Sequence, residues 1–126
     1  MRRTSEAAQR ALDRRQHEDS APRLHIEVPR LLTLRLDILD GGPVAMGGIV
    51  HVRHVVVAAA PALFDIPCAD RHCKDGGHDV TWEIMRSLRA NSARFEGEHE
   101  CSGSVGAMGT SRCNRVMKYT RTATYG

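Results

Sequence analysis

The four cysteines of this chain are the feature that most limits how it can fold. Cys68 and Cys73 form a C-x4-C pair within IPCADRHCKDGGHDVTW, and Cys101 and Cys113 form a C-x11-C pair around a Gly/Ser-rich loop. Two cysteine pairs from different parts of a chain are the usual source of a four-cysteine zinc site, because the fold brings both pairs to one tetrahedral ion. We therefore expect one structural zinc ion per chain, held by all four cysteines.

The composition makes such an ion useful to the fold. The 126 residues suit one domain, and apolar residues make up 41% of them, but aromatic residues only 4%. Few large rings mean that each buried side chain removes little apolar surface from water. A structural zinc ion adds folding free energy on the order of 10 kcal/mol in small zinc modules, which compensates for a modest core.

Hydrophobic periodicity predicts the first strands. LTLRLDIL at 32–39 places Leu32, Leu34, Leu36 and Ile38 on one face, the period of two typical of a half-buried strand. LHIEV at 24–28 alternates in the same way. The run at 49–57 is β-branched with apolar residues on both faces, which predicts a central strand. DGGP at 40–43 has the composition of a turn.

A helix and a hairpin follow the first cysteine pair. Asp79 is placed to cap a helix that begins at Val80 and ends near Asn91. The apolar stripe of this helix consists of Val80, Ile84, Met85 and Leu88. Segments 93–101 and 113–125 then read as two paired strands. We expect Cys101 opposite Cys113, which places Glu96 opposite Lys118 and His99 opposite Arg115. The expected fold class is α+β, with a small antiparallel sheet packed on one main helix.

The N-terminal 22 residues differ from the rest. Residues 4–16 are good helix formers, but their apolar side chains are small, so such a helix would bury little. We expect a polar helical or disordered leader at 1–22, with a linker at 17–23, followed by a single zinc-binding α+β domain at 23–126.

Two other states of the cysteines stay open at this point, namely reduced core residues and disulfides. His99 and His78 lie near the cysteine pairs, as does His72, and each could replace a cysteine as ligand or support one. In ligand chemistry the chain is similar to zinc-ribbon and treble-clef modules. Iron bound by the same four cysteines is a further alternative.

A catalytic alternative rests on a second resemblance. HIE at His25–Glu27 and PCADRHC at Pro67–Cys73 resemble the H-x-E and P-C-x2-4-C motifs of zinc-dependent deaminases. The resemblance implies a zinc hydrolase with His25, Cys68 and Cys73 as ligands and Glu27 as acid/base. In that family H-x-E begins a helix, whereas here it lies in a strand-like run, and Cys101 and Cys113 would have no role.

Two groups of residues are candidates for a binding surface. Arg115, Tyr119 and Arg121 alternate with other residues on one predicted strand, and cations beside aromatic rings suit nucleic acid. Cross-strand pairing or burial would equally explain them. Trp82, Arg86 and Arg89 follow one another at helical spacing beside the apolar stripe. A lone Trp in an aromatic-poor chain is more often a core residue, which is the interpretation we favour.

The sequence therefore predicts a zinc-stabilised binding or accessory module without catalytic activity. The net charge of +3 is compatible with nucleic acid as partner, and a larger protein complex is the other expected partner. We expect a cytoplasmic protein with no membrane contact, because no run approaches the roughly 20 apolar residues of a membrane span, and with no small-molecule substrate. A third hypothesis is a structural subunit whose N-terminal helix docks on an assembly.

Overall fold

The computed structural model describes residues 6–39, 50–69, 73, 76–105, 111–113 and 115–126. It is mixed α/β, with an antiparallel sheet and a few helices. In chain order the elements are α1 (Glu6–Ser20), α2 (Leu24–Glu27), β1 (Leu31–Leu39), β2 (Val50–Val55), β3 (Asp65–Ile66), β4 (His78–Asp79), α3 (Thr81–Arg89), β5 (Arg94–Glu100), β6 (Ser104–Val105), β7 (Ser111–Arg112) and β8 (Val116–Tyr125).

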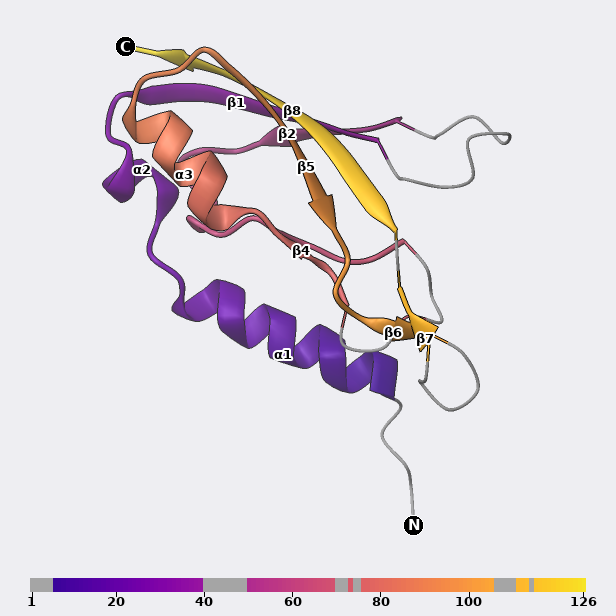
Figure 1. Cartoon of the computed structure of the whole chain (residues 1–126). Coiled ribbons are helices and arrows are strands. Elements are labelled where there is room, and N and C mark those ends of the chain that lie inside the picture. The colour runs from indigo at the N-terminus through magenta and orange to yellow at the C-terminus, as the bar shows by residue number, and fades with distance from the viewer. Residues whose placement is uncertain (1–5, 40–49, 70–72, 74–75, 106–110, 114) are drawn as a thin grey trace.

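The main sheet has the strand order β2-β1-β8-β5, with every neighbouring pair antiparallel. Figure 1 shows α3 lying against one face of this sheet, and α1 lying farther from it. The short β3–β4 and β6–β7 pairs lie below the sheet in this view. Side chains on the other face, such as Arg35, Glu96 and Thr122, are exposed. One face in water and one in the core is common for antiparallel sheets.

The hydrophobic core lies between β1 and α3, as the periodicities predict. Leu34, Leu36 and Ile38 of β1 are buried in one cluster with the apolar stripe of α3. That stripe contains Val80, Ile84, Met85 and Leu88, which confirms the predicted buried face. Spacings of two on a strand and of three to four on a helix each gather apolar side chains on one side, so the two faces pack together.

Two predictions about the first strands are wrong. Leu32 was expected on the buried face but is 61% exposed, because the pairing register shifts between Leu31 and Thr33 and turns the side chains over. The strand expected at 49–57 to be central is instead the edge strand β2, and its described residues 51–54 are exposed. Its β-branched residues reflect strand propensity rather than burial on two faces.

The segment 24–28 is a helical turn rather than the predicted strand. The N–H of Val28 donates to the carbonyl of Leu24 at 2.9 Å, and both side chains are buried. The apolar residues Leu24, Ile26 and Val28 alternate as in a strand. Leu24 and Val28 are also four residues apart, which fits one face of a helix. Ile26 is 64% exposed. Five residues are too few for the pattern to separate the two structures.

The helix α3 begins close to the predicted position. The side chain of Asp79 accepts a hydrogen bond from the N–H of Thr81 at 3.1 Å, although Val80 rather than Asp79 occupies the N-cap. The chain leaves the helix at Asn91, whose φ of 58° lies in the left-handed region that often ends helices. Asp79 therefore supports the first turn from one residue farther out than expected.

The predicted pairing of the last two strands is confirmed, but their register is displaced by two residues. Glu98 lies opposite Lys118, and His99 lies opposite Met117. The expected pair of Glu96 and Lys118 is therefore replaced by an ion pair of Lys118 with Glu98, at 3.7 Å. The displacement arises because the connection is not a plain loop. It contains the β6–β7 pair, in which Ser104 lies opposite Arg112.

The helix α1 extends farther than expected. Helical structure continues to Ser20, through most of the predicted linker. Its described side chains are exposed apart from the half-buried Arg14, and Leu12 is among the exposed apolar residues. No helix within the described ranges is both long enough and apolar enough to cross a bilayer. The turn expected at 40–43 lies outside the described residues.

We predict that Gly97→Ala destabilises the protein. Gly97 lies opposite Tyr119, and a Cβ at this position would lie 2.5 Å from Oη and 2.6 Å from Cζ of that ring. Because Tyr119 is only 4% exposed, it has little room to move. We expect a loss of about 1–3 kcal/mol, typical of an overpacked site, seen as a lower urea midpoint. Gly126→Ala is the control, because its Cβ meets Leu32 at ordinary distances from 3.4 Å. Equal midpoints for the two variants would contradict the prediction.

Candidate metal centre

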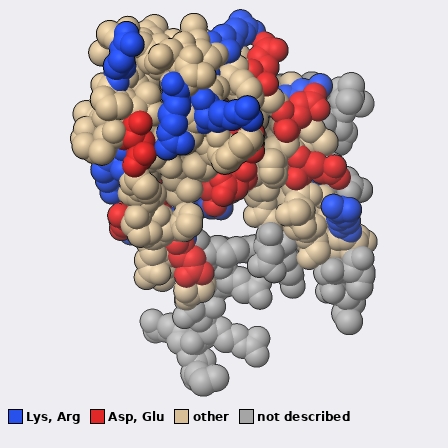
Figure 2. All heavy atoms as spheres, turned by 60° about the vertical axis from the view of Figure 1, so that its left-hand side comes forward, with Lys and Arg blue, Asp and Glu red and all other residues tan. Residues whose placement is uncertain are grey.

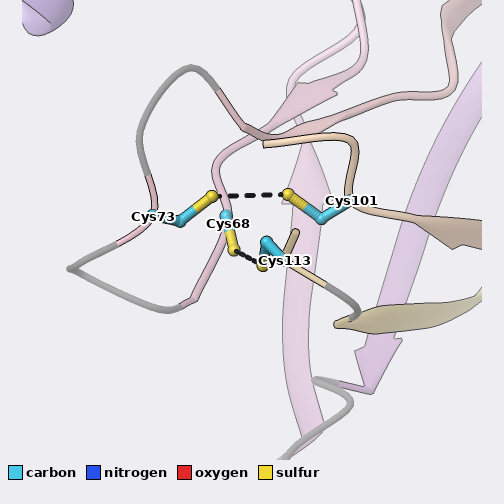
Figure 3. Close-up of side chains that lie close together, drawn as sticks. All are labelled: Cys68, Cys73, Cys101 and Cys113. Atoms are coloured by element: carbon cyan, nitrogen blue, oxygen red, sulfur yellow. Dashed lines mark hydrogen bonds between the residues drawn. The ribbon is translucent and has the colours of Figure 1, made fainter. Parts of the chain in front are cut away.

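The four cysteines come from two separate parts of the fold. Cys68 and Cys73 lie in the connection between β3 and β4, whereas Cys101 directly follows β5 and Cys113 directly follows β7. Figure 3 shows their sulfur atoms facing one another across a small space. The two pairs that the sequence places 28 or more residues apart are thus brought together, as the spacing predicts.

The distances between the sulfur atoms suit a metal ion. Sγ of Cys73 lies 3.6 Å from Sγ of Cys101, and Sγ of Cys68 lies 3.8 Å from Sγ of Cys113. All four sulfurs lie within 4.8 Å of one another. Four thiolates at about 2.3 Å from a central ion form a tetrahedron whose edge is about 3.8 Å. A disulfide would hold two sulfurs at about 2.05 Å, and the cysteines are free.

Backbone N–H groups support one of the sulfurs. Gly77 and Gly103 both donate to Sγ of Cys101 at 3.4 Å. Burial opposes ionisation of this thiol, but the two donated hydrogen bonds favour the thiolate and its pKa is lowered below the usual value. The two N–H groups therefore prepare Cys101 to act as an anionic ligand.

Cys73 behaves in the opposite way when no ion is bound. Burial raises the pKa of its thiol, and the hydrogen bonds with Cys101 and Cys113 raise it further. A metal ion must displace this proton, because the thiolate is the ligand. Metal binding at these four residues therefore releases protons, and the apparent affinity falls as the pH falls.

The connection after Cys101 also holds the second pair in place. The N–H of Cys101 donates to the carbonyl of Arg115, and the N–H of Cys113 donates to the carbonyl of Gly103, both at 2.8 Å. Cys101 and Cys113 were expected to face each other across the β5–β8 hairpin. They are instead brought together by the short β6–β7 pair, which folds the long connection back on itself.

Two histidines lie next to the cysteines and contact each other. Nδ1 of His78 lies 3.0 Å from Nδ1 of His99, with the rings at 88°. His78 is 3% exposed. Its contact with His99 joins β4 to β5, and these two strands follow the first cysteine pair and precede Cys101 respectively. Among the described residues, the group of side chains within reach of one ion consists of the four cysteines. His72 lies outside the described residues.

His25 and Glu27, which form the H-x-E part of the deaminase resemblance, do not lie beside the cysteines. His25 and Glu27 belong to α2, which lies at the opposite end of the fold from the β6–β7 pair (Figure 1). Glu27 forms an ion pair with Arg89 at 3.2 Å. His25 is exposed and is not part of the group that could hold an ion.

Part of the predicted binding surface is buried. Arg121 is fully buried and donates to the carbonyl of Ser92 at 2.7 Å and to Oγ of Ser87 at 2.8 Å. Burial lowers the pKa of Arg121 and raises that of Tyr119 to about 12. Tyr119 and Arg121 are therefore core residues, and the expectation that they contact a partner is corrected. Arg115 is half-buried.

The predicted helical patch is on the surface. Trp82 is 65% exposed, against the expectation of a core position. The guanidinium carbon of Arg86 lies 5.2 Å from the centroid of its ring, a cation–π contact. Arg89 lies on the same helix, where it pairs with Glu27. The strong amphipathicity of α3 puts its buried stripe on one side and leaves Trp82 on the other.

Three glycines around the cysteines were missed as parts of the site. Gly76 and Gly77 belong to a DGG stretch that the sequence marks only as a turn, and Gly103 lies in the Gly/Ser-rich connection. A Cβ on Gly76 would lie against the sulfurs of both Cys73 and Cys101. Glycine beside a ligand cysteine was the available signal, because only a residue without a side chain lets the backbone come so close.

Comparison with models of known protein families, with curated proteins and with solved structures finds no match to this chain.

We predict that Gly76→Ala weakens metal binding. The added methyl group would fill space between the sulfurs of Cys73 and Cys101, so at least one ligand must move. We expect a loss of about 10- to 100-fold in zinc affinity, as for other residues that position ligands, measured by competition with a chromophoric chelator. Ser102→Ala, at an exposed position beside Cys101, is the control. Equal affinities for Gly76→Ala and the wild type would show that the glycine does not shape the site.

Proposed function

We propose that the chain is a zinc-stabilised binding or accessory module, without catalytic activity. The observation that carries the proposal is the set of four sulfurs within 4.8 Å of one another. Zinc suits four thiolates in a tetrahedron and needs no redox partner. Two cysteines come from the β3–β4 connection and two from the segment around the β6–β7 pair. This arrangement is similar to that of zinc-ribbon modules. Free thiols fit a reducing compartment, so we propose the cytoplasm.

A closed structural site supports this function better than catalysis. Catalytic zinc sites keep one position open for water or substrate, whereas four protein ligands complete a tetrahedron. Cys73, Cys101 and Cys113 are buried, and Cys68 is half-buried. The hydrolase alternative would need His25 beside Cys68. Although His25 and Glu27 lie in a helix, as that family requires, α2 lies at the opposite end of the fold from the β6–β7 pair.

We expect one zinc ion per purified chain and loss of that ion in Cys113→Ser. Because binding free energy becomes folding free energy, the variant should also lose cooperative thermal unfolding. Zinc is measured by mass spectrometry of the metal, and unfolding by circular dichroism. The matched variant Glu27→Gln lies outside the site and should keep its zinc. Full zinc content in Cys113→Ser would mean that this cysteine is not a ligand, and the closed four-cysteine site would be wrong.

The surface that best suits a partner lies on α3. Trp and Arg are the residue types most enriched among energetically dominant interface positions, and Trp82 with Arg86 forms such an exposed pair. A groove beside them is lined by Pro22, Trp82, Met85 and Arg89, among others. Figure 2 brings the left-hand side of Figure 1 forward and shows basic side chains interspersed with acidic ones on this face of the molecule.

We propose a protein complex rather than nucleic acid as the partner at this surface. Sequence-tolerant nucleic-acid binding combines several stacking rings with a charged track. With Tyr119 and Arg121 buried, Trp82 is the remaining exposed ring among the proposed binding residues. Acidic Glu27 and Asp79 also line the groove, and their charge would repel phosphates.

The partner is tested by placing a photo-crosslinking amino acid at position 82 of the full chain in cells. We expect one discrete protein adduct from position 82 and none from position 122, an exposed residue on the far face of the sheet. Adducts that disappear on nuclease treatment would make the partner a nucleic acid. Equal labelling from both positions would show that Trp82 marks no interface.

A further inference from the structure

We propose that a cavity beside the cysteine cluster binds a small organic carboxylate with an apolar body. The cavity lies between the edge strand β2 and the segment that follows β3, and its volume is about 300 Å³. This is the lower end of the range for small-molecule sites. The inference goes beyond a zinc module with a protein partner, because it assigns a ligand to a different face of the molecule.

The apolar part of the site comes from the core. Ile38 of β1, Ile66 of β3 and Met117 of β8 line the cavity, and all three are otherwise buried. They come from three different strands, so the hydrophobic surface is held by the fold rather than by one mobile loop. An aliphatic chain placed against it would leave water, at a gain of about 0.8 kcal/mol per buried CH₂ group.

The polar part is cationic. His51 and Arg53 of β2 line the cavity and lie opposite Ile38 and Leu36 in the sheet, so both project from the edge strand toward the buried face. Within the described part of the chain, no hydrogen bond or ion pair engages the side chain of Arg53. A guanidinium group without an acidic neighbour, beside an apolar surface, binds a carboxylate through two parallel hydrogen bonds.

Charge separates this cavity from two other hollows of the described structure. The hollow on the outer face of the sheet is lined by Asp37, Glu96 and Glu98 together with Lys118. The groove beside Trp82 is lined by Glu27 and Asp79 together with Arg89, so carboxylates outnumber cations in both. No described residue that lines the cavity beside β2 is acidic. Its single guanidinium matches a singly charged carboxylate better than a phosphate dianion, and the apolar floor favours a ligand with a hydrocarbon body.

The remaining wall is shared with the cysteine cluster. Cys68 and His78 line the cavity, and the ring of His78 is fixed by its contact with His99. A metal ion on Cys68 would hold this wall in place, and only this part of the inference rests on the proposed zinc site. The floor and the cationic rim belong to the main sheet and do not depend on the ion.

The test uses the full, zinc-loaded chain and sodium hexanoate as the probe. We expect saturable shifts of the imidazole NMR signals of His51 and His78 during the titration. Arg53→Gln should weaken binding at least tenfold, because the carboxylate loses its charged partner. Arg35→Gln is the matched control, since Arg35 lies on the opposite face of the sheet and pairs with Asp37. It should bind hexanoate as the wild type does.

Three results would overturn the proposal. These are the absence of saturation with hexanoate, wild-type affinity in Arg53→Gln, and tighter binding of the uncharged hexanamide or of inorganic phosphate than of hexanoate. Zinc is measured in the same samples. If the zinc-loaded protein does not bind hexanoate, the proposed ligand site is wrong and the zinc module proposal is unaffected. A protein that binds hexanoate and contains no zinc would support the cavity and contradict the zinc proposal.

Discussion

The short distances between the four cysteine thiols are the constraint on which the structure around β3, β4, β6 and β7 depends. Thiolates 3.6 to 3.8 Å apart repel one another strongly unless a cation lies between them. Without a cation the site keeps protons, because burial raises the pKa of Cys73 and the neighbouring cysteines raise it further. Among the described residues, the buried cysteines form a cluster separate from the main core, with Cys68 and Val105 packed against it. An ion held by the four cysteines would join the β3–β4 connection to the segment around β6 and β7.

The main sheet and α3 are organised differently, around the buried guanidinium group of an arginine. Arg121 of β8 crosses to the end of α3, where it donates to Oγ of Ser87 and to the carbonyl of Ser92. The hydroxyl of Tyr125 donates to the same carbonyl at 2.7 Å. These bonds tie the turn after α3 to the sheet, and they satisfy polar groups that would be costly to bury unpaired. The protein thus has a polar anchor at the end of α3 and a cysteine cluster near the β6–β7 pair.

Some of this could be read from the sequence, and the reasons for success and failure are physical. The cysteine set follows from ligand chemistry, and the buried faces of β1 and α3 follow from periodicity. The alternation in β8 shows that Tyr119 and Arg121 share a face, but it cannot say which face is buried. An arginine on the inner face needs hydrogen-bond acceptors, and the fold supplies two of them at residues 87 and 92. The bulge at Leu32 and the register of β5 likewise depend on neighbouring strands and on the β6–β7 pair.

The order of the ligands along the chain has a further consequence for the unfolded state. Cys73 and Cys101 are 28 residues apart, and Cys68 and Cys113 are 45 apart. The whole of α3 and β5 lies between the inner two. An ion that stays bound while the sheet opens would convert this stretch into a closed ring with far fewer conformations than a free chain. The helix and the strand would then search for each other within that ring, and the cysteines would act on the path back to the native state as well as on its stability.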